Sequence, residues 1–322
     1  MKKKISLLMC LILCVSLFVS VDIKAQEQSV NLHKVVIVQE LLDELNEVGD
    51  YVNVKVLKDY DDTERYYYLP FSTGGYLIYD VNLNIIHEYS VCESNAKIDG
   101  NSEVYYGGAL VYLIEQNGKF YDLSLEVSIG NKREIIEKSR VIQEKMKNNF
   151  QYSRTSLPAT RNTIKGTVPN YSYNPNGICG STASAMMLRW YNNNVNGKYV
   201  PSNLETSDGV ALIKHLKSYI DGSTPGSSAG DVFTGIQSYC KKQGVSHAGG
   251  FDRITADYII GRVDSYKRPY IMGLYNHPTY KDHWVTGYGY RISGGTVYAI
   301  VNDGHGKTGV SLNLTNADYI VW

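Results

Sequence analysis

The segment Gly177–Tyr191, GICGSTASAMMLRWY, constrains the chain more than any other. A cysteine between small residues opens a run of good helix formers, and apolar side chains recur in that run at about the spacing of a buried helix face. We therefore expect Cys179 at or just before a helix N-terminus, where free amide groups and the helix dipole stabilise an anion. Such a position favours the thiolate form of a cysteine near neutral pH. The alternative is that Cys179 is a small buried residue, as free cysteines often are.

Two strand-like segments downstream are separated by a Gly-Gly turn. The first, 281–290, contains His283 near its start, and the second, 296–304, ends in Asn302 and Asp303. Pairing of the two segments as a hairpin would bring His283 beside these two polar residues. Because successive strand residues point to opposite faces, only one of the two side chains is expected to reach the imidazole.

Four segments of the chain carry a family resemblance in their order and spacing. They are GICGSTASAMMLRWY (177–191), RPYIMGL (268–274), DHWVTGYGY (282–290) and YAIVNDG (298–304). Together they resemble the Cys, His and Asp or Asn boxes of bacterial papain-like cysteine peptidases. The similarity is greatest to the bacteriocin-processing (double-glycine) peptidase-like family and more distant to streptopain and the staphopains. It implies an α+β, papain-like fold for residues 167–322, with a helical half and an antiparallel sheet.

The resemblance also implies roles for individual residues. Cys179 would be the nucleophile and His283 the general base and acid. The residue that orients His283 stays open between Asp303, which matches the bacteriocin-processing group, and Asn302, which matches streptopain; we favour Asp303. The family's oxyanion-hole Gln is expected a few residues before the cysteine, where Asn174 can donate a side-chain N–H instead.

The chain before the catalytic region divides into three parts. Residues 1–25 combine lysines, an apolar run and a final alanine, which is typical of a secretory signal peptide. We therefore expect a bacterial protein that is secreted or associated with the cell wall. Residues 26–150 indicate a small antiparallel-sheet α+β propeptide or accessory domain, and 151–166 a linker or cleavage region.

Local patterns predict the elements of both halves. We expect helices at 35–48, 131–148, 207–220, 231–242 and 255–266, with Ser207 as a cap. We expect strands at 51–57, 65–70, 75–80, 85–91, 108–115 and 269–274.

Charge distribution favours a two-part protein. Residues 26–159 carry 13 Lys and Arg against 21 Asp and Glu, whereas residues 160–322 carry 15 against 10. Complementary fields can hold an acidic segment against a basic domain. We therefore expect the N-terminal segment to act as an intramolecular inhibitor that is cleaved near 154–161. A permanent accessory domain is the alternative.

The remaining cysteines and histidines give no second centre of chemistry. Beyond the signal peptide, Cys92, Cys179 and Cys240 provide no disulfide framework, and Cys240 falls on the apolar stripe of a predicted helix. We expect no cofactor or metal, because no paired metal-ligand motif occurs. Lone histidines are expected on the solvent side; they are His215, His247, His277 and His305.

The sequence thus predicts a secreted thiol peptidase that hydrolyses polypeptide substrates and is made as an autoprocessed zymogen. No nucleic-acid partner is expected, since the mature part has no Lys and Arg cluster, and no membrane contact is expected in the mature form. A cell-wall peptide amidase or an acyl transferase would use the same triad. A catalytically inactive papain-like binding module is the third alternative.

Overall fold

The computed structural model describes residues 36–45, 51–91, 98, 102–123, 127–221, 226–274 and 283–322. The chain divides into two units, Met1–Asn46 and Glu47–Trp322. Helix α2 (Val36–Leu45) belongs to the first unit and confirms the helix predicted there. The predicted signal peptide, Cys92 and His277 lie outside the described residues.

The described strands of the second unit form one extended sheet, which places the chain in the predicted α+β class. Their order is β10-β15-β11-β12-β13-β14-β4-β3-β2-β1-β5-β6-β7-β8, with β9 pairing to β12. The strands are β1 (Lys55–Lys58), β2 (Glu64–Pro70), β3 (Tyr76–Asp80), β4 (Ile85–Ser90), β5 (Tyr105–Gly108), β6 (Val111–Gln116), β7 (Lys119–Asp122), β8 (Val127–Asn131), β9 (Thr160–Thr163), β10 (Phe251–Arg253), β11 (Tyr270–Leu274), β12 (His283–Ser293), β13 (Thr296–Asn302), β14 (Val310–Asn313) and β15 (Ala317–Val321).

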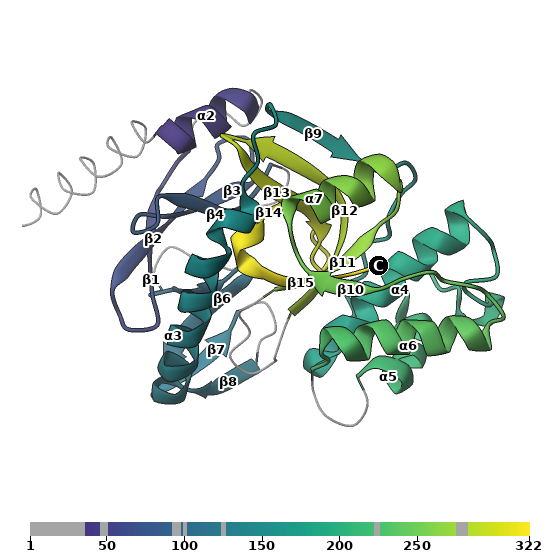
Figure 1. Ribbon diagram of the computed structural model, residues 1–322. Helices are drawn as coiled ribbons and strands as arrows, with labels where there is room; N and C mark the ends of the chain where they lie inside the picture. The colour runs from purple at the N-terminus through teal and green to yellow at the C-terminus, as the bar shows by residue number, and fades with distance from the viewer. Residues whose placement is uncertain are drawn as a thin grey trace, which may run out of the picture. The chain divides into compact units, whose positions relative to one another are not determined.

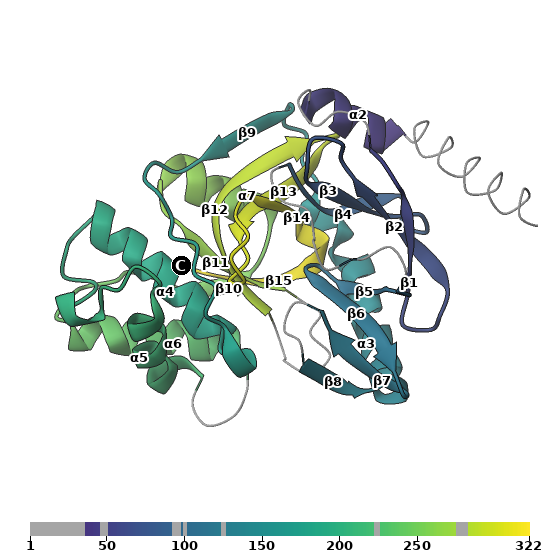
Figure 2. The same ribbon diagram turned by 180° about the vertical axis from the view of Figure 1, so that it is seen from behind.

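Three helices gather at one side of this sheet, as Figure 1 and the opposite view in Figure 2 both show. They are α4 (Cys179–Asn194), α5 (Val210–Ile220) and α6 (Ala229–Lys242). The long helix α3 (Lys132–Asn149) follows β8, and the short helix α7 (Ala256–Ile260) continues into a π-helical turn, η4 (Gly261–Ser265). The 3₁₀ turns are η1 (Phe150–Ser153), η2 (Pro175–Gly177), η3 (Ser202–Leu204) and η5 (Leu314–Asn316).

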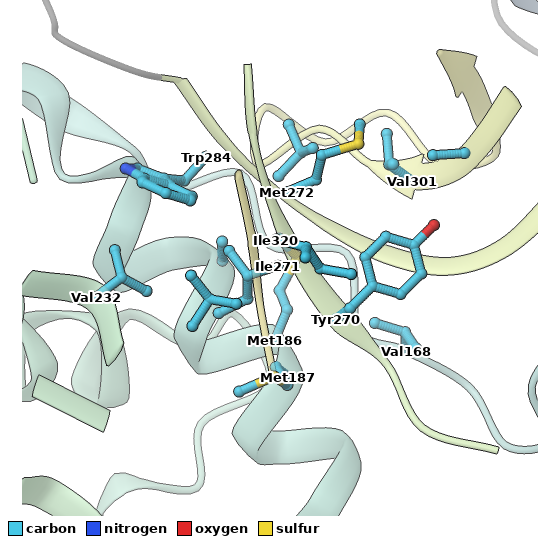
Figure 3. Packing of buried hydrophobic residues seen from close by; sticks show 14 of the residues in the cluster. Val168, Met186, Met187, Val232, Tyr270, Ile271, Met272, Trp284, Val301 and Ile320 are labelled. Carbon is cyan, nitrogen blue, oxygen red and sulfur yellow. The ribbon is translucent and has the colours of Figure 1, made fainter. Parts of the chain in front are cut away.

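Helix α4 is the central helix of the C-terminal core. Every residue from Cys179 to Leu188 is buried, so the helix is covered on all sides rather than on one face. Figure 3 shows Met186 and Met187 of α4 packed with Ile271 of β11 and Ile320 of β15. Small residues such as Ala183 let neighbouring elements approach this helix closely.

The predicted hairpin is confirmed, because β12 pairs antiparallel with β13. The first half of β12 also pairs with β11, where His283 lies opposite Leu274. Its second half pairs with β9, and Ile292 lies opposite Thr160. The stretch 151–166 therefore contains a strand of the sheet. Its Ser, Thr and Arg composition gave no apolar period because β9 is an edge strand whose side chains stay largely outside the core.

The N-terminal strands continue the same sheet instead of forming a separate one. Strand β14 pairs antiparallel with β4, with Leu312 opposite Glu88. Buried side chains reinforce this seam: Asn313 donates its side-chain N–H to the Ile86 carbonyl at 2.9 Å. The His87 ring nitrogen Nδ1 lies 3.0 Å from the Asn316 amide oxygen. The N-terminal strands are thus joined to the C-terminal sheet by main-chain and buried polar contacts.

Several boundaries differ from the prediction. Ser207 is not a helix cap, because α5 begins at Val210 after Gly209, whose φ of 71° is in the left-handed region. Helix α6 begins two residues earlier than predicted and carries a capping box formed by Ser228 and Asp231. Strands β5, β7, β8, β10, β14 and β15 were not predicted, because their short segments carry little alternation.

Candidate active site

Cys179 is the first residue of α4, as predicted, and is 2% exposed. The turn η2 precedes it and ends at Gly177, whose φ of 73° is one that other residues rarely adopt. Thr182 ties the first turn of α4 back to this segment, because its hydroxyl donates to the Tyr173 carbonyl at 2.9 Å. Because Cys179 stands at the N-terminus of α4, the helix dipole favours an anion at this position.

The first turn of α4 is also anchored to the loop that follows α5. Ser181 donates its hydroxyl to the Asp221 carboxylate, and Ser227 donates to the other oxygen of that carboxylate at 3.1 Å. Burial raises the pKa of Asp221, although both hydroxyls favour the ionised form. Gly180 has no room for a side chain, since a Cβ there would collide with the Ser227 hydroxyl. The backbone beside Cys179 is therefore held from two directions.

His283 is the first residue of β12 and is 8% exposed. Its ring nitrogen Nε2 lies 3.2 Å from the main-chain carbonyl oxygen of Asp303. A carbonyl only accepts hydrogen bonds, so Nε2 carries the proton and Nδ1 is the basic nitrogen of the neutral ring. This contact fixes both the tautomer and the orientation of the imidazole.

The starts of α4 and β12 are tied to each other. The Thr286 hydroxyl of β12 donates to the Ala183 carbonyl of α4 at 2.9 Å. Trp284, the neighbour of His283, donates its indole N–H to the Ser227 carbonyl at 2.9 Å. Ser227 is also the residue that lies against Gly180. The residues next to His283 and next to Cys179 thus contact the same loop residue, which brings the two predicted catalytic residues to one region.

Asp303 reaches His283 through its main-chain carbonyl, while its carboxylate closes the following turn. One carboxylate oxygen accepts the backbone N–H groups of His305 at 2.8 Å and Lys307 at 2.9 Å. Burial raises the pKa of Asp303, and the two amides and the charge of Lys307 offset this only in part. The carboxylate therefore shapes the loop whose first carbonyl contacts His283.

The Asn302 side chain lies against the segment that leads to Cys179. It donates to the carbonyls of Val168 at 3.1 Å and Pro169 at 2.9 Å. Its amide oxygen accepts from the Thr308 hydroxyl at 2.7 Å. The Asn302 carboxamide therefore holds two chain segments together and is not bonded to His283 by any of these contacts. This agrees with the expectation that only one of the neighbouring residues Asn302 and Asp303 reaches the imidazole.

Two further polar side chains complete the region. The ring of His305 stacks on that of His283, with centroids 5.2 Å apart and an interplanar angle of 13°. Asn174 is buried, and its side-chain nitrogen lies 3.5 Å from Nε2 of His305. The oxygen of the same carboxamide is buried and has no hydrogen-bond partner in the described part of the chain. Asn174 therefore lies beside His305, whose ring stacks on that of His283.

His305 was missed from the sequence, where it was expected on the solvent side. The structure makes it half-buried, because the Asp303 carboxylate binds its amide and folds the loop back over His283. The local signal is the sequence Asp-Gly-His-Gly directly after a strand, where the glycines permit a tight return.

Of the predictions for the other cysteine and histidine side chains, one is confirmed and one is wrong. Cys240 is buried in the core as predicted, and burial raises its pKa to about 12. The solvent-side prediction for His247 is wrong, because this residue is 7% exposed. Among the described residues, no three His, Cys, Asp or Glu side chains cluster closely enough to hold a metal ion.

Comparisons with known proteins assign no family. Neither the protein-family models nor the curated proteins that were searched match this chain. In the described part of the chain, no helix has the length and apolar character needed to span a membrane. The functional argument therefore depends on the geometry of the residues themselves.

Proposed function

We propose that this chain is a secreted, papain-like thiol peptidase with Cys179 as nucleophile and His283 as general base and acid. The observation that carries the proposal is the contact between His283 Nε2 and the Asp303 carbonyl. This contact leaves Nδ1 basic, at the start of a strand that Thr286 ties to the helix beginning with Cys179. A thiol at a helix N-terminus and a positioned base are what nucleophilic catalysis by cysteine requires.

The proposed reaction follows from these positions. Nδ1 of His283 takes the thiol proton, and the sulfur attacks a substrate amide carbonyl to give a tetrahedral intermediate. The imidazolium returns its proton to the leaving amine, and a thioester on Cys179 remains. Water, deprotonated by the same imidazole, then hydrolyses the thioester and restores the thiol. The Asp303 carbonyl stabilises the imidazolium in both steps because it accepts a hydrogen bond from Nε2–H.

Two donors are proposed for the oxyanion. The first is the backbone N–H of Cys179 at the start of α4. The second is the carboxamide of Asn174, which is buried beside His305 and has an unpaired oxygen that permits its rotation. Loss of one such donor typically lowers kcat by about 100- to 1000-fold.

The N-terminal segment is proposed as an intramolecular inhibitor. The turn between β5 and β6 carries Ala109 and Leu110, which are buried in the same hydrophobic cluster as Cys179. Leu110 has a φ of 67°, a conformation that L-residues rarely adopt, and its amide donates to the buried Glu88 carboxylate at 2.6 Å. A strained turn held this firmly supports a blocking role for the β5–β6 turn before cleavage.

The proposal is tested with residues 26–322 and with the Cys179→Ala and Cys240→Ala variants of the same protein. We expect the parent and Cys240→Ala to shorten to a C-terminal fragment and to hydrolyse casein. Cys179→Ala should do neither. Electrophoresis, N-terminal sequencing and a casein assay follow the three proteins over time. Retained casein hydrolysis in Cys179→Ala would contradict the proposal.

Thiol labelling separates a peptidase from an inactive module. Iodoacetamide at pH 6 should label Cys179, whereas Cys240, with its pKa raised to about 12, should stay unlabelled because it holds almost no thiolate. Peptide mass spectrometry locates the label. An inert Cys179 in a folded protein would favour the inactive binding module, and a labelled Cys179 without casein hydrolysis would favour an amidase or acyl transferase.

A further inference from the structure

A cavity of about 510 Å³ lies at the end of α4 that is remote from Cys179. Tyr191 of α4 forms part of its wall, and the helical rise places this residue ~18 Å along the axis from the cysteine. The π-helical turn η4 and Trp322 line other parts of the cavity. The cavity is therefore separate from the candidate active site, and its volume suits a small molecule.

Two buried polar side chains of this cavity have unpaired nitrogen atoms. Arg262 and His247 both line it, and each is 7% exposed. Nε of Arg262 and Nε2 of His247 have no hydrogen-bond partner among the residues that the structure describes. Buried polar atoms in proteins are nearly always paired, so two unpaired ones in a single cavity indicate a ligand group that would pair them.

The charge of the cavity favours an anion. Nη2 of Arg262 donates to the Tyr191 hydroxyl at 3.3 Å and to the Pro269 carbonyl at 3.2 Å, and both of these oxygens are uncharged. Arg268 contributes a second guanidinium to the same wall. Burial lowers the pKa of Arg262, Tyr191 and Tyr266 offset this in part, and the charge of Arg268 lowers it further. Asp257 also lines the cavity but is exposed to solvent, where water screens its charge.

Aromatic rings supply the rest of the lining. Trp322 and Tyr258 stack with centroids 5.5 Å apart, and Tyr199 is buried on another side. Tyr266 lies over the Arg262 guanidinium at 5.3 Å and is 65% exposed, so its ring can turn aside without disturbing the core. These faces suit a flat, apolar group.

We propose that this cavity binds a carboxylate attached to an aromatic group, with Arg262 and Arg268 holding the carboxylate and the tyrosine and tryptophan rings holding the aromatic group. The neutral His247 donates or accepts the remaining hydrogen bond. A planar carboxylate matches the edge of a guanidinium, which can bind both of its oxygens. A free aromatic acid and the C-terminus of a peptide ending in an aromatic residue share this chemistry.

Calorimetric titration of the full chain carrying Cys179→Ala tests the site. The probes are phenylacetate and N-acetyl-L-phenylalanine, each paired with its neutral amide. We expect at least one acid to bind about tenfold or more tightly than its amide. Arg268→Gln should weaken binding of the acid about tenfold and leave binding of the amide unchanged. Arg140→Gln, on the exposed surface of α3, should change neither.

Arg262→Lys provides a second variant that keeps the charge but removes the unpaired Nε. This variant should also weaken binding of the acid, provided its thermal unfolding stays cooperative. If its unfolding is not cooperative, the result with Arg268→Gln alone tests the site. Binding of only the phenylalanine derivative identifies a peptide C-terminus as the source, and binding of phenylacetate identifies a free acid. The site is refuted if neither acid binds at about 10 mM, if acids and amides bind equally, or if Arg140→Gln weakens the acid as much as Arg268→Gln.

Discussion

His305 is the residue whose position says most about how the candidate site is held. Its ring lies nearly parallel to that of His283, and its backbone N–H is bound by the Asp303 carboxylate. The imidazole of His283 is thus fixed at one nitrogen by a carbonyl and on one face by a second ring. Orientation of this kind matters because a small displacement of a base lowers the rate of proton transfer steeply.

Substitution of His305 tests this positioning role. His305→Ala removes the stacked ring and should lower kcat/KM by about ten- to a hundredfold, mainly through kcat. His305→Phe keeps a flat ring and should recover much of the loss. Steady-state kinetics of both variants on one peptide substrate provide the measurement. Equal impairment of the two variants would show that a ring nitrogen of His305, rather than stacking, is needed.

At the scale of elements, the start of α4 depends on a close approach that only glycine allows. A Cβ on Gly180 would collide with the Ser227 hydroxyl, within the group of contacts that ties α4 to the loop after α5. Gly180→Ala should therefore reduce the free energy of unfolding by about 1–3 kcal/mol and lower activity by shifting Cys179. Urea unfolding and a peptidase assay measure the two effects.

Two controls isolate that collision. Gly197→Ala should be nearly neutral, since a Cβ there meets no atom within 4 Å. Adding Ser227→Ala to Gly180→Ala removes the hydroxyl that is struck, and it should return part of the lost stability. A double variant that is less stable than the sum of the two single variants would refute the steric explanation.

The elements near Cys179 and His283 were predictable because strong local signals lie close together there. The helix at Cys179 and the hairpin of β12 and β13 have clear periodicity and a clear turn. The strand β9 and the stacking of His305 were not predictable, since both depend on pairing with residues far away in the sequence. The pairing of β4 with β14 was not predictable either, because the sequence of neither strand specifies which distant strand it pairs with.

At the scale of the whole molecule, the seam between β4 and β14 predicts that cleavage alone does not release the N-terminal segment, so inhibition would end through movement of the β5–β6 turn and not through dissociation. The seam combines main-chain pairing with the buried contact between His87 and Asn316. A protease site inserted after Leu157, which is 47% exposed, allows a controlled cut in the Cys179→Ala protein. The two fragments should co-elute in size-exclusion chromatography and separate only in denaturant.

Substitutions at the seam sharpen this test. Asn316→Ala leaves the His87 ring nitrogen and carbonyl without their partner and should weaken the association of the fragments. Asn148→Ala, at an exposed position of α3, should not. Fragments that elute separately without any substitution would show that the segment behaves as a readily released propeptide.

Acid should weaken this part of the molecule through Asp80. Its carboxylate binds Arg65 at 2.7 Å and the His87 ring at 3.2 Å, directly behind the seam. Burial alone would raise the pKa of Asp80, but the hydrogen bonds and charges of His87 and Arg65 outweigh it and hold that pKa well below its usual range. A carboxyl with a lowered pKa stabilises the fold above its unfolded-state pKa of about 3.9 and loses that contribution as the pH falls further.

The free energy of unfolding should therefore decline between about pH 4 and pH 2 in the parent protein, and Asp80→Asn should flatten that decline. The variant should also be less stable at pH 7, by about 3–5 kcal/mol, because Arg65 and His87 lose a buried partner. Glu137→Gln, at an exposed site of α3, is the matched control and should follow the parent. Urea unfolding at a series of pH values measures all three. If the curve of Asp80→Asn runs parallel to that of the parent down to pH 2, another group is responsible for the acid sensitivity of the sheet.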